Sequence, residues 1–177
     1  MVSSLNDSSY TRWVLIALSG LVLVWQLKRC SGGGPSEGAE APPIDLPIVA
    51  AAVGEPTRWS LVDREQKPVL IEVFASWCGT CRRAAPALAR AHEKYGNDLQ
   101  FVGVSVDDDP TLAAEAKQSW QIPYPVAHDD TGSFARAYKI RVLPTFVLLD
   151  RQGRIAEVSA GLPSERRVDE WAGSLLR

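Results

Sequence analysis

Two cysteines with two residues between them are the part of this sequence best suited to chemistry. Cys78 and Cys81 enclose Gly79 and Thr80, and they directly follow a mostly apolar run, residues 69–77. Thiols at this spacing close a small disulfide ring where the backbone turns into a helix. The first turn of a helix also offers unpaired N–H groups and the positive end of the dipole, which favour a thiolate on the first sulfur. We therefore expect Cys78 to be the nucleophile and Cys81 the resolving thiol.

A metal site is the other chemistry that paired cysteines offer. Zinc needs four ligands, and the remaining candidates, Cys30, His92 and His128, lie at scattered positions without a second metal-type spacing. A c-type haem site would need histidine at position 82, where the chain has arginine. The sequence therefore predicts no metal, and no cofactor besides a redox-active disulfide. Both histidines are expected at the surface.

The elements that must position the two thiols alternate between strands and helices. Residues 68–75 have the composition of a central strand covered on both faces, and residues 79–95 have an apolar helical face that ends at Gly96-Asn97. A short strand is expected at 59–62, and further strands and helices at 99–106, 110–120, 125–127, 131–138, 145–150, 154–160 and 164–176. This order predicts an α/β sandwich of three layers with a mixed central sheet.

The N-terminal part of the chain predicts a membrane anchor. Residues 13–27 are uncharged and apolar, with basic residues on both sides and tryptophan near each end. A cleaved signal peptide and a buried soluble helix are the alternatives. Four segments follow: a tail at 1–12, a transmembrane anchor at 13–29, a flexible Gly- and Pro-rich linker at 30–56, and a globular domain at 57–177. The net charge of −2 gives no indication of nucleic-acid binding.

The motif FASWCGTC at residues 74–81, with VLPTFVLLDRQGRI at 142–155, resembles the thioredoxin superfamily. The similarity is to its membrane-tethered thiol–disulfide oxidoreductases of the TlpA/ResA type, and it covers about residues 57–176. It implies a thioredoxin-like sandwich, and the unit near 125–138 is similar to an insertion found in this branch. It also implies protein thiol and disulfide substrates.

The resemblance also assigns substrate-binding residues. Pro144 is implied to be a cis-proline that faces the disulfide, and the backbone of Leu143 to pair with an extended substrate segment. Trp77 is implied to shield the disulfide and touch the substrate, and Gly79 and Thr80 complete the set. The alternatives are that Pro144 is an ordinary trans residue at a strand start and that Trp77 is a plain core aromatic.

Glu72 matches the position of the buried carboxylate that serves thioredoxin as a proton acceptor. A carboxylate in an apolar strand is costly unless its pKa rises, and a raised pKa suits a base that exchanges protons with Cys81 near neutral pH. Glu72 is therefore the expected general base, with a solvent-exposed position at a sheet edge as the alternative. Ala84 stands where many proteins of this branch carry glutamate, which puts a strictly cytochrome-type role in doubt.

Together these features predict a membrane-tethered thiol–disulfide oxidoreductase that reduces protein disulfides, for example in cytochrome c maturation. The resemblance implies a location in the cytoplasmic membrane, with the catalytic domain facing the periplasm or outside, and a transmembrane protein as electron donor. A disulfide-forming oxidant and a non-catalytic binding module are alternatives. A peroxidase on the same fold is disfavoured, because Ala75 stands where such enzymes carry threonine or serine.

Overall fold

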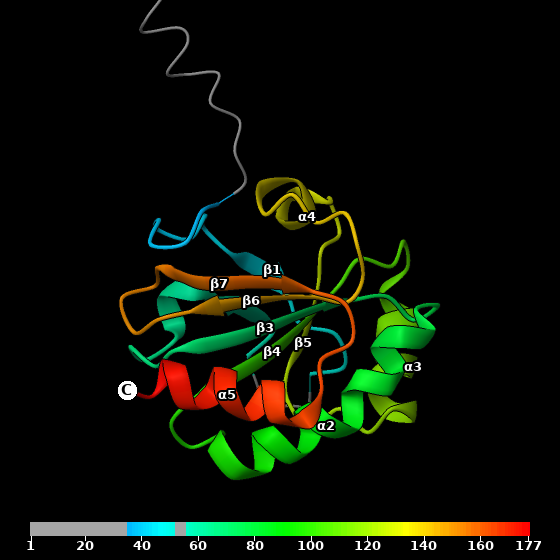
Figure 1. Ribbon diagram of the computed structural model, residues 1–177. Coiled ribbons are helices and arrows are strands. Elements are labelled where there is room, and N and C mark those ends of the chain that lie inside the picture. The colour runs from blue at the N-terminus through cyan, green and yellow to red at the C-terminus, as the bar shows by residue number, and fades with distance from the viewer. Residues whose placement is uncertain (1–34, 52–55) are drawn as a thin grey trace, which may run out of the picture. The chain divides into compact units, whose positions relative to one another are not determined.

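Five strands form the central sheet of the part of the chain that the computed structural model describes, residues 35–51 and 56–177 (Figure 1). The strands are β3 (Val69–Phe74), β4 (Gln100–Ser105), β5 (Val126–His128), β6 (Thr145–Leu149) and β7 (Ile155–Ala160). Their order is β5-β4-β3-β6-β7, in which β3, β4 and β5 are parallel, whereas β6 is antiparallel to both β3 and β7. The prediction of a mixed sheet is confirmed.

Strand β3 lies at the centre of this sheet, and all six of its residues are buried. Its apolar composition suits this place, because a strand covered on both faces has no solvent side. Its antiparallel register with β6 pairs Val73 with Thr145. The end of β3 and the start of β6 therefore meet at one edge of the sheet, which is where the cysteine motif follows β3.

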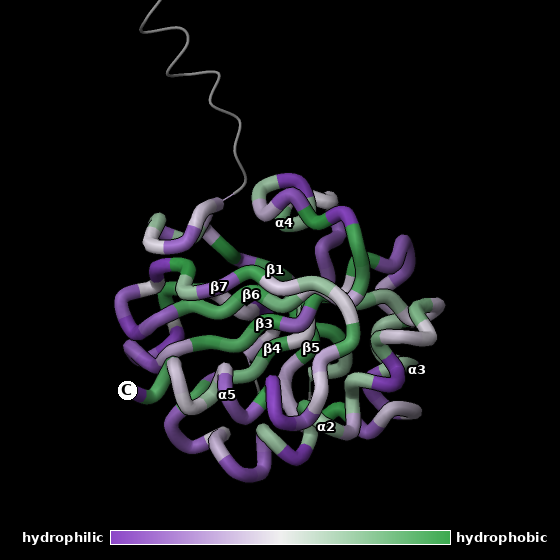
Figure 2. The backbone as a smooth tube through the Cα atoms, in the orientation of Figure 1, coloured by the Kyte–Doolittle hydropathy of each residue, from purple (hydrophilic) through white to green (hydrophobic). Residues whose placement is uncertain are grey.

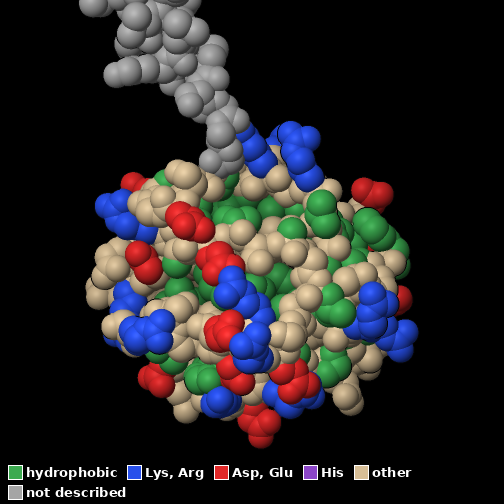
Figure 3. Space-filling view, in the orientation of Figure 1, with side chains coloured by type: hydrophobic (Ala, Val, Ile, Leu, Met, Phe, Trp, Pro, Cys, Tyr) green, Lys and Arg blue, Asp and Glu red, His purple; other side chains and the backbone are tan. Residues whose placement is uncertain are grey.

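Helices α2 (Gly79–Tyr95) and α5 (Glu165–Leu175) cover one face of the sheet (Figure 1). They contribute Leu88 and Trp171 to a buried cluster that includes Leu70 and Phe74 of β3. The outer sides of these helices are charged, and Figure 3 shows acidic and basic side chains side by side where α5 lies. Ion pairs link the two helices, for example Lys94 with Asp169, 3.1 Å apart. The predicted bounds of the 79–95 helix are confirmed.

The opposite face of the sheet is covered by β1 (Asp45–Pro47), β2 (Arg58–Ser60), the 3-10 turn Leu61–Asp63 and α4 (Ser133–Ala137). Helix α3 (Pro110–Ser119) contacts the edge strand β5, and the side chain of Asp109 caps its first turn. In Figure 2 the hydrophobic residues follow the central strands, between these two coverings. The predicted strand at 59–62 is shorter than expected, because the backbone turns into the 3-10 helix after Ser60.

The segment before residue 57 differs from the expected flexible linker. Strand β1 pairs with β2, and Ile48 forms an isolated bridge with Ala127 of β5. Ile44 and Leu46 are buried in the cluster on that face of the sheet. The expectation was wrong because these few apolar residues bury against strands distant in the sequence, and no local periodicity reveals such pairing. The folded domain therefore includes residues upstream of the expected boundary.

The predicted tail and membrane anchor, and Cys30, lie outside the described residues. Among the residues that the structure does describe, no helix has the length and apolar character that a membrane crossing requires.

Candidate active site

The two cysteines form a disulfide at the N-terminus of α2, with an Sγ–Sγ distance of 2.04 Å. Cys78 is the residue that caps the helix, and its Sγ accepts a hydrogen bond from the backbone N–H of Cys81 at 3.1 Å. The side chain of Cys78 lies at the surface end of the helix and is 7% exposed, whereas Cys81 is completely buried. A thiol or disulfide approaching from solvent therefore reaches Cys78 first.

The electrostatic environment of this helix end is positive. The first turn of α2 contains no acidic residue, while Arg82 and Arg83 are both exposed there. The guanidinium group of Arg83 donates a hydrogen bond to the hydroxyl oxygen of Thr80, at 3.2 Å. Free N–H groups and positive charge at a helix N-terminus stabilise an anionic sulfur relative to a neutral thiol. The arrangement favours a thiolate at Cys78 in the reduced protein.

Asp107, which the sequence analysis did not single out, holds the loop that carries the disulfide. It is buried, two residues beyond the end of β4, and its carboxylate accepts hydrogen bonds from the backbone N–H of Ser76 (2.9 and 3.1 Å) and from the Ser76 hydroxyl (2.8 Å). The hydroxyl of Ser105 donates a further bond, at 2.8 Å. Ser76 immediately precedes Trp77 and Cys78, so Asp107 fixes the base of the active-site loop.

We expect Asp107→Ala to lower the free energy of unfolding by about 3 kcal/mol, because it leaves the half-buried donors of Ser76 and the buried hydroxyl of Ser105 without this acceptor. Urea unfolding of the oxidised protein measures this loss. The matched control is Asp108→Ala, which removes the neighbouring exposed carboxylate and should change the stability by less than about 0.5 kcal/mol. Equal effects of the two variants would contradict the assigned role of Asp107.

Three apolar residues lie next to the disulfide in the sequence or before the strand that pairs with β3: Trp77, Leu143 and Pro144. Trp77 is 73% exposed, so the alternative of a plain core aromatic is wrong. The Leu143–Pro144 peptide bond is cis, so the alternative of a trans proline is also wrong. Pro144 is buried and Leu143 is half-buried, directly before β6. Since β6 pairs with β3, these residues lie at the edge of the sheet from which the cysteine loop extends.

Glu72 lies in the middle of β3 and is 1% exposed, so the alternative of a solvent-exposed edge position is wrong. Strand alternation places its side chain on the same face as Leu70 and Phe74, which is the face covered by α2 and by Cys81. One carboxyl oxygen, Oε2, accepts a hydrogen bond from the hydroxyl of Tyr124 at 3.0 Å, and Oε1 has no hydrogen-bond partner in the part of the chain that the structure describes. Burial raises the pKa of Glu72 to about 7, although the bond from Tyr124 acts to lower it.

The surface position expected for the histidines was wrong for His128. His128 ends β5 and is 5% exposed, and its Nε2 lies 2.7 Å from the backbone carbonyl oxygen of Asp107. His92 is half-buried, with its ring near those of Phe101 and Tyr124. The sequence contained no local signal for either position, because the residues that contact them belong to other segments of the chain.

A disulfide that caps a helix, a cis-proline at the neighbouring strand and a buried carboxylate below them define a class of protein. On this fold they describe a thioredoxin-like thiol–disulfide oxidoreductase. The chain belongs to the Redoxin family, whose sequence profile matches residues 36–172. The matched region begins upstream of residue 57, in agreement with the packing of β1.

Individual relatives agree with this assignment. The thiol–disulfide oxidoreductase ResA of Oceanobacillus iheyensis is 26% identical over 139 residues, which cover 78% of this chain and 72% of ResA. The thioredoxin-like protein YneN of Bacillus subtilis is 27% identical over 140 residues, which cover 77% and 79% of the two chains. The crystal structure of a putative thiol:disulfide interchange protein DsbE from Chlorobium tepidum superposes with a TM-score of 0.73 at 26% identity, covering 81% of this chain and all of that one. The chain is thus a thiol–disulfide oxidoreductase similar to ResA and DsbE.

Proposed function

We propose that this protein is a membrane-tethered oxidoreductase that reduces disulfides in other proteins outside the cytoplasm. The observation that carries the proposal is the helix-capping disulfide, in which Cys78 lies nearer to solvent beside the exposed ring of Trp77. An enzyme that acts on folded or extended polypeptides needs an accessible sulfur and an apolar surface around it. The pair Cys78 and Cys81 is the redox centre.

In the first step the Cys78 thiolate attacks one sulfur of the substrate disulfide. A mixed disulfide forms, and the other substrate sulfur leaves as a thiolate. In the second step Glu72 takes the proton from the Cys81 thiol, and the Cys81 thiolate attacks Cys78, which releases the second substrate thiolate. Two electrons pass from the enzyme to the substrate, and the enzyme is left oxidised. It therefore needs a dithiol donor, for which a transmembrane electron-carrying protein is the class expected.

The residues around the disulfide are proposed to bind the substrate chain. Trp77 supplies an exposed apolar contact, and Gly79 and Thr80 line the outer surface between the cysteines. The backbone of Leu143 lies before the buried Pro144 and before Thr145, where the pairing of β6 with β3 begins, and it is proposed to pair with an extended peptide. These contacts are independent of substrate sequence, which suits an enzyme that acts on cysteines in different chains.

The segments before the folded domain are proposed to attach it to the membrane. Residues 13–29 are the proposed anchor, and the tail at 1–12 precedes it. The linker that follows is shorter than residues 30–56, because β1 is part of the fold. We place the domain on the periplasmic or outer side of the cytoplasmic membrane, with cytochrome c precursors as one class of substrate.

A disulfide-forming oxidant is the second candidate, because one observation favours it. The positive helix end with Arg82 and Arg83 stabilises the reduced thiolate form, and stabilising the reduced form raises the reduction potential. Equilibrating the Cys78–Cys81 pair with glutathione buffers decides the direction. We expect a potential near that of thioredoxin, about −270 mV, and a value above about −180 mV would establish the oxidant instead. Using the Cys30→Ser variant keeps the third thiol of the chain out of the equilibrium.

A further inference from the structure

The hydroxyl group of Tyr124 makes the one hydrogen bond that the carboxyl group of Glu72 receives within the described residues. We infer that Tyr124 is a positioning residue for the reaction: its hydroxyl holds the Glu72 carboxyl group and keeps it able to release its proton at neutral pH. This inference rests on the proposed role of Glu72 as the base for Cys81. Tyr124 lies 52 positions from Glu72 in the chain, outside every motif of the cysteine region.

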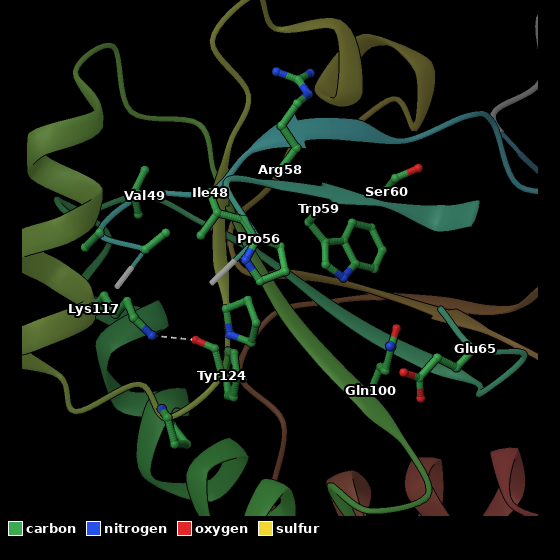
Figure 4. A pocket seen from close by; sticks show the side chains of 14 residues that line it. Ile48, Val49, Pro56, Arg58, Trp59, Ser60, Glu65, Gln100, Lys117 and Tyr124 are labelled. Atoms are coloured by element: carbon green, nitrogen blue, oxygen red, sulfur yellow. Dashed lines mark hydrogen bonds between the residues drawn. The ribbon is translucent and has the colours of Figure 1, made fainter. Parts of the chain in front are cut away.

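The ring of Tyr124 is fixed from several sides. It is 2% exposed and stacks on Phe101 of β4, with ring centroids 5.8 Å apart and planes 29° apart. The backbone carbonyl oxygen of Tyr124 accepts a hydrogen bond from the Nζ of Lys117 at 2.7 Å, as Figure 4 shows. Packing on the ring and a tether on the backbone leave the hydroxyl little freedom to move, so it meets Glu72 in one orientation.

Tyr124 also follows one proline and precedes another, Pro123 and Pro125. Proline fixes its own backbone φ angle and restricts the residue before it to extended conformations. The segment therefore enters β5, which starts at Val126, with a limited set of backbone conformations. This restriction adds to the ring contacts and holds the tyrosine at the level of Glu72.

The chemical effect of this hydrogen bond has a definite direction. A carboxylate is a stronger acceptor than a neutral acid, so a donor on Oε2 favours the ionised form of Glu72 and opposes the effect of burial. Tyr124 remains a donor throughout the physiological range, because burial and the adjacent Glu72 raise its own pKa well above the ordinary value. Without the hydroxyl, burial alone would act on Glu72, and its proton would be released only at higher pH.

Other titratable groups lie on the elements packed around this pair. They are Cys81 and His92 of α2 and Lys117 of α3. Cys81 is in the disulfide in the oxidised protein and does not titrate there. The pKa of His92 is lowered by burial and by the nearby charge of Lys117, so a His92→Gln variant is measured in parallel to exclude titration of the histidine.

The test is Tyr124→Phe in the full chain, with the Glu72 carboxyl group followed by ¹³C NMR as a function of pH in the oxidised protein. The midpoint of the Glu72 titration should rise by about one pH unit, since hydrogen bonds to charged groups are worth at least that much. An unchanged midpoint would overturn the inference. The control is Tyr138→Phe, which removes a hydroxyl that donates to the Pro42 carbonyl oxygen at 2.9 Å on the other face of the sheet and should leave Glu72 unchanged.

A second measurement needs no substitution. In the unaltered protein the ¹³Cζ resonance of Tyr124 should shift with the same midpoint as the Glu72 carboxyl signal, because the two groups share one hydrogen bond. Independent titrations would contradict the pairing even if the phenylalanine variant failed to fold.

The kinetic consequence is measured separately. The pH at which release of the mixed disulfide becomes fast should move upward in Tyr124→Phe by the same amount as the Glu72 midpoint. Adding Tyr124→Phe to Glu72→Gln should cause no further change in that profile. Because the NMR titration uses no substrate, it distinguishes a failure of this inference from a failure of the proposed reductase activity.

Discussion

Cys78→Ser is expected to lose all disulfide exchange, so that reduction of a protein disulfide falls to the uncatalysed rate. The reason is that a serine hydroxyl does not ionise near neutral pH, whereas the helix N-terminus stabilises a thiolate at Cys78. The fold should persist, because serine is itself a favoured residue at the N-cap position that Cys78 occupies. The assay follows reduction of a protein disulfide by a dithiol donor with each variant present.

Cys81→Ser is the matched variant, and it should behave differently. Cys78 can still attack, but the buried position 81 no longer supplies a resolving thiol, so the mixed disulfide should accumulate and be visible on a non-reducing gel. Two results would indicate one of the other functional classes. A binding module would retain its activity in Cys78→Ser. A peroxidase would reduce peroxide when a dithiol donor is supplied. Either result would contradict the oxidoreductase mechanism.

Glu72→Gln is expected to slow the second half of the reaction and to remove a pH dependence of stability. Proton transfer by a positioned base contributes at least about a hundredfold, so the lifetime of the mixed disulfide near pH 7 should increase by about that factor. Quenching the reaction at successive times and measuring the mixed disulfide gives this rate. Glu93→Gln, which changes an exposed carboxylate on α2, should leave it unchanged.

The effect on stability follows from the raised pKa of Glu72. The pKa of Glu72 rises from 4.5 to about 7 in the folded protein, so between these values the folded state binds more protons than the unfolded state. Its contribution to stability is therefore present below about pH 4.5 and is lost as the pH rises to about 7. The loss amounts to about 3 kcal/mol in the oxidised protein. Urea unfolding at pH 5 and pH 8 should show most of this decrease in the natural chain relative to Glu72→Gln, and parallel curves would contradict it.

Features that depend on residues close together in the chain could be predicted from the sequence. The buried strand β3, the start of a helix at the cysteine pair and the end of that helix at Tyr95 were all predicted. A buried strand, a helix cap and a helix stop are set by residues within one or two turns. The cis peptide bond before Pro144 was implied by family resemblance rather than by any local pattern. The same local information predicted the observed order of strands and helices along the chain, and from that order a mixed central sheet.

The contacts that support the disulfide depend on how distant segments of the chain pack together. Asp107 reaches Ser76 across 31 positions and Tyr124 reaches Glu72 across 52, and neither pairing leaves a mark on the local sequence. For the same reason the segment that contains β1 was mistaken for a linker, and His128 for a surface residue. Local composition can place a strand or start a helix, but the partner of a buried polar group depends on which distant strands the sheet brings together.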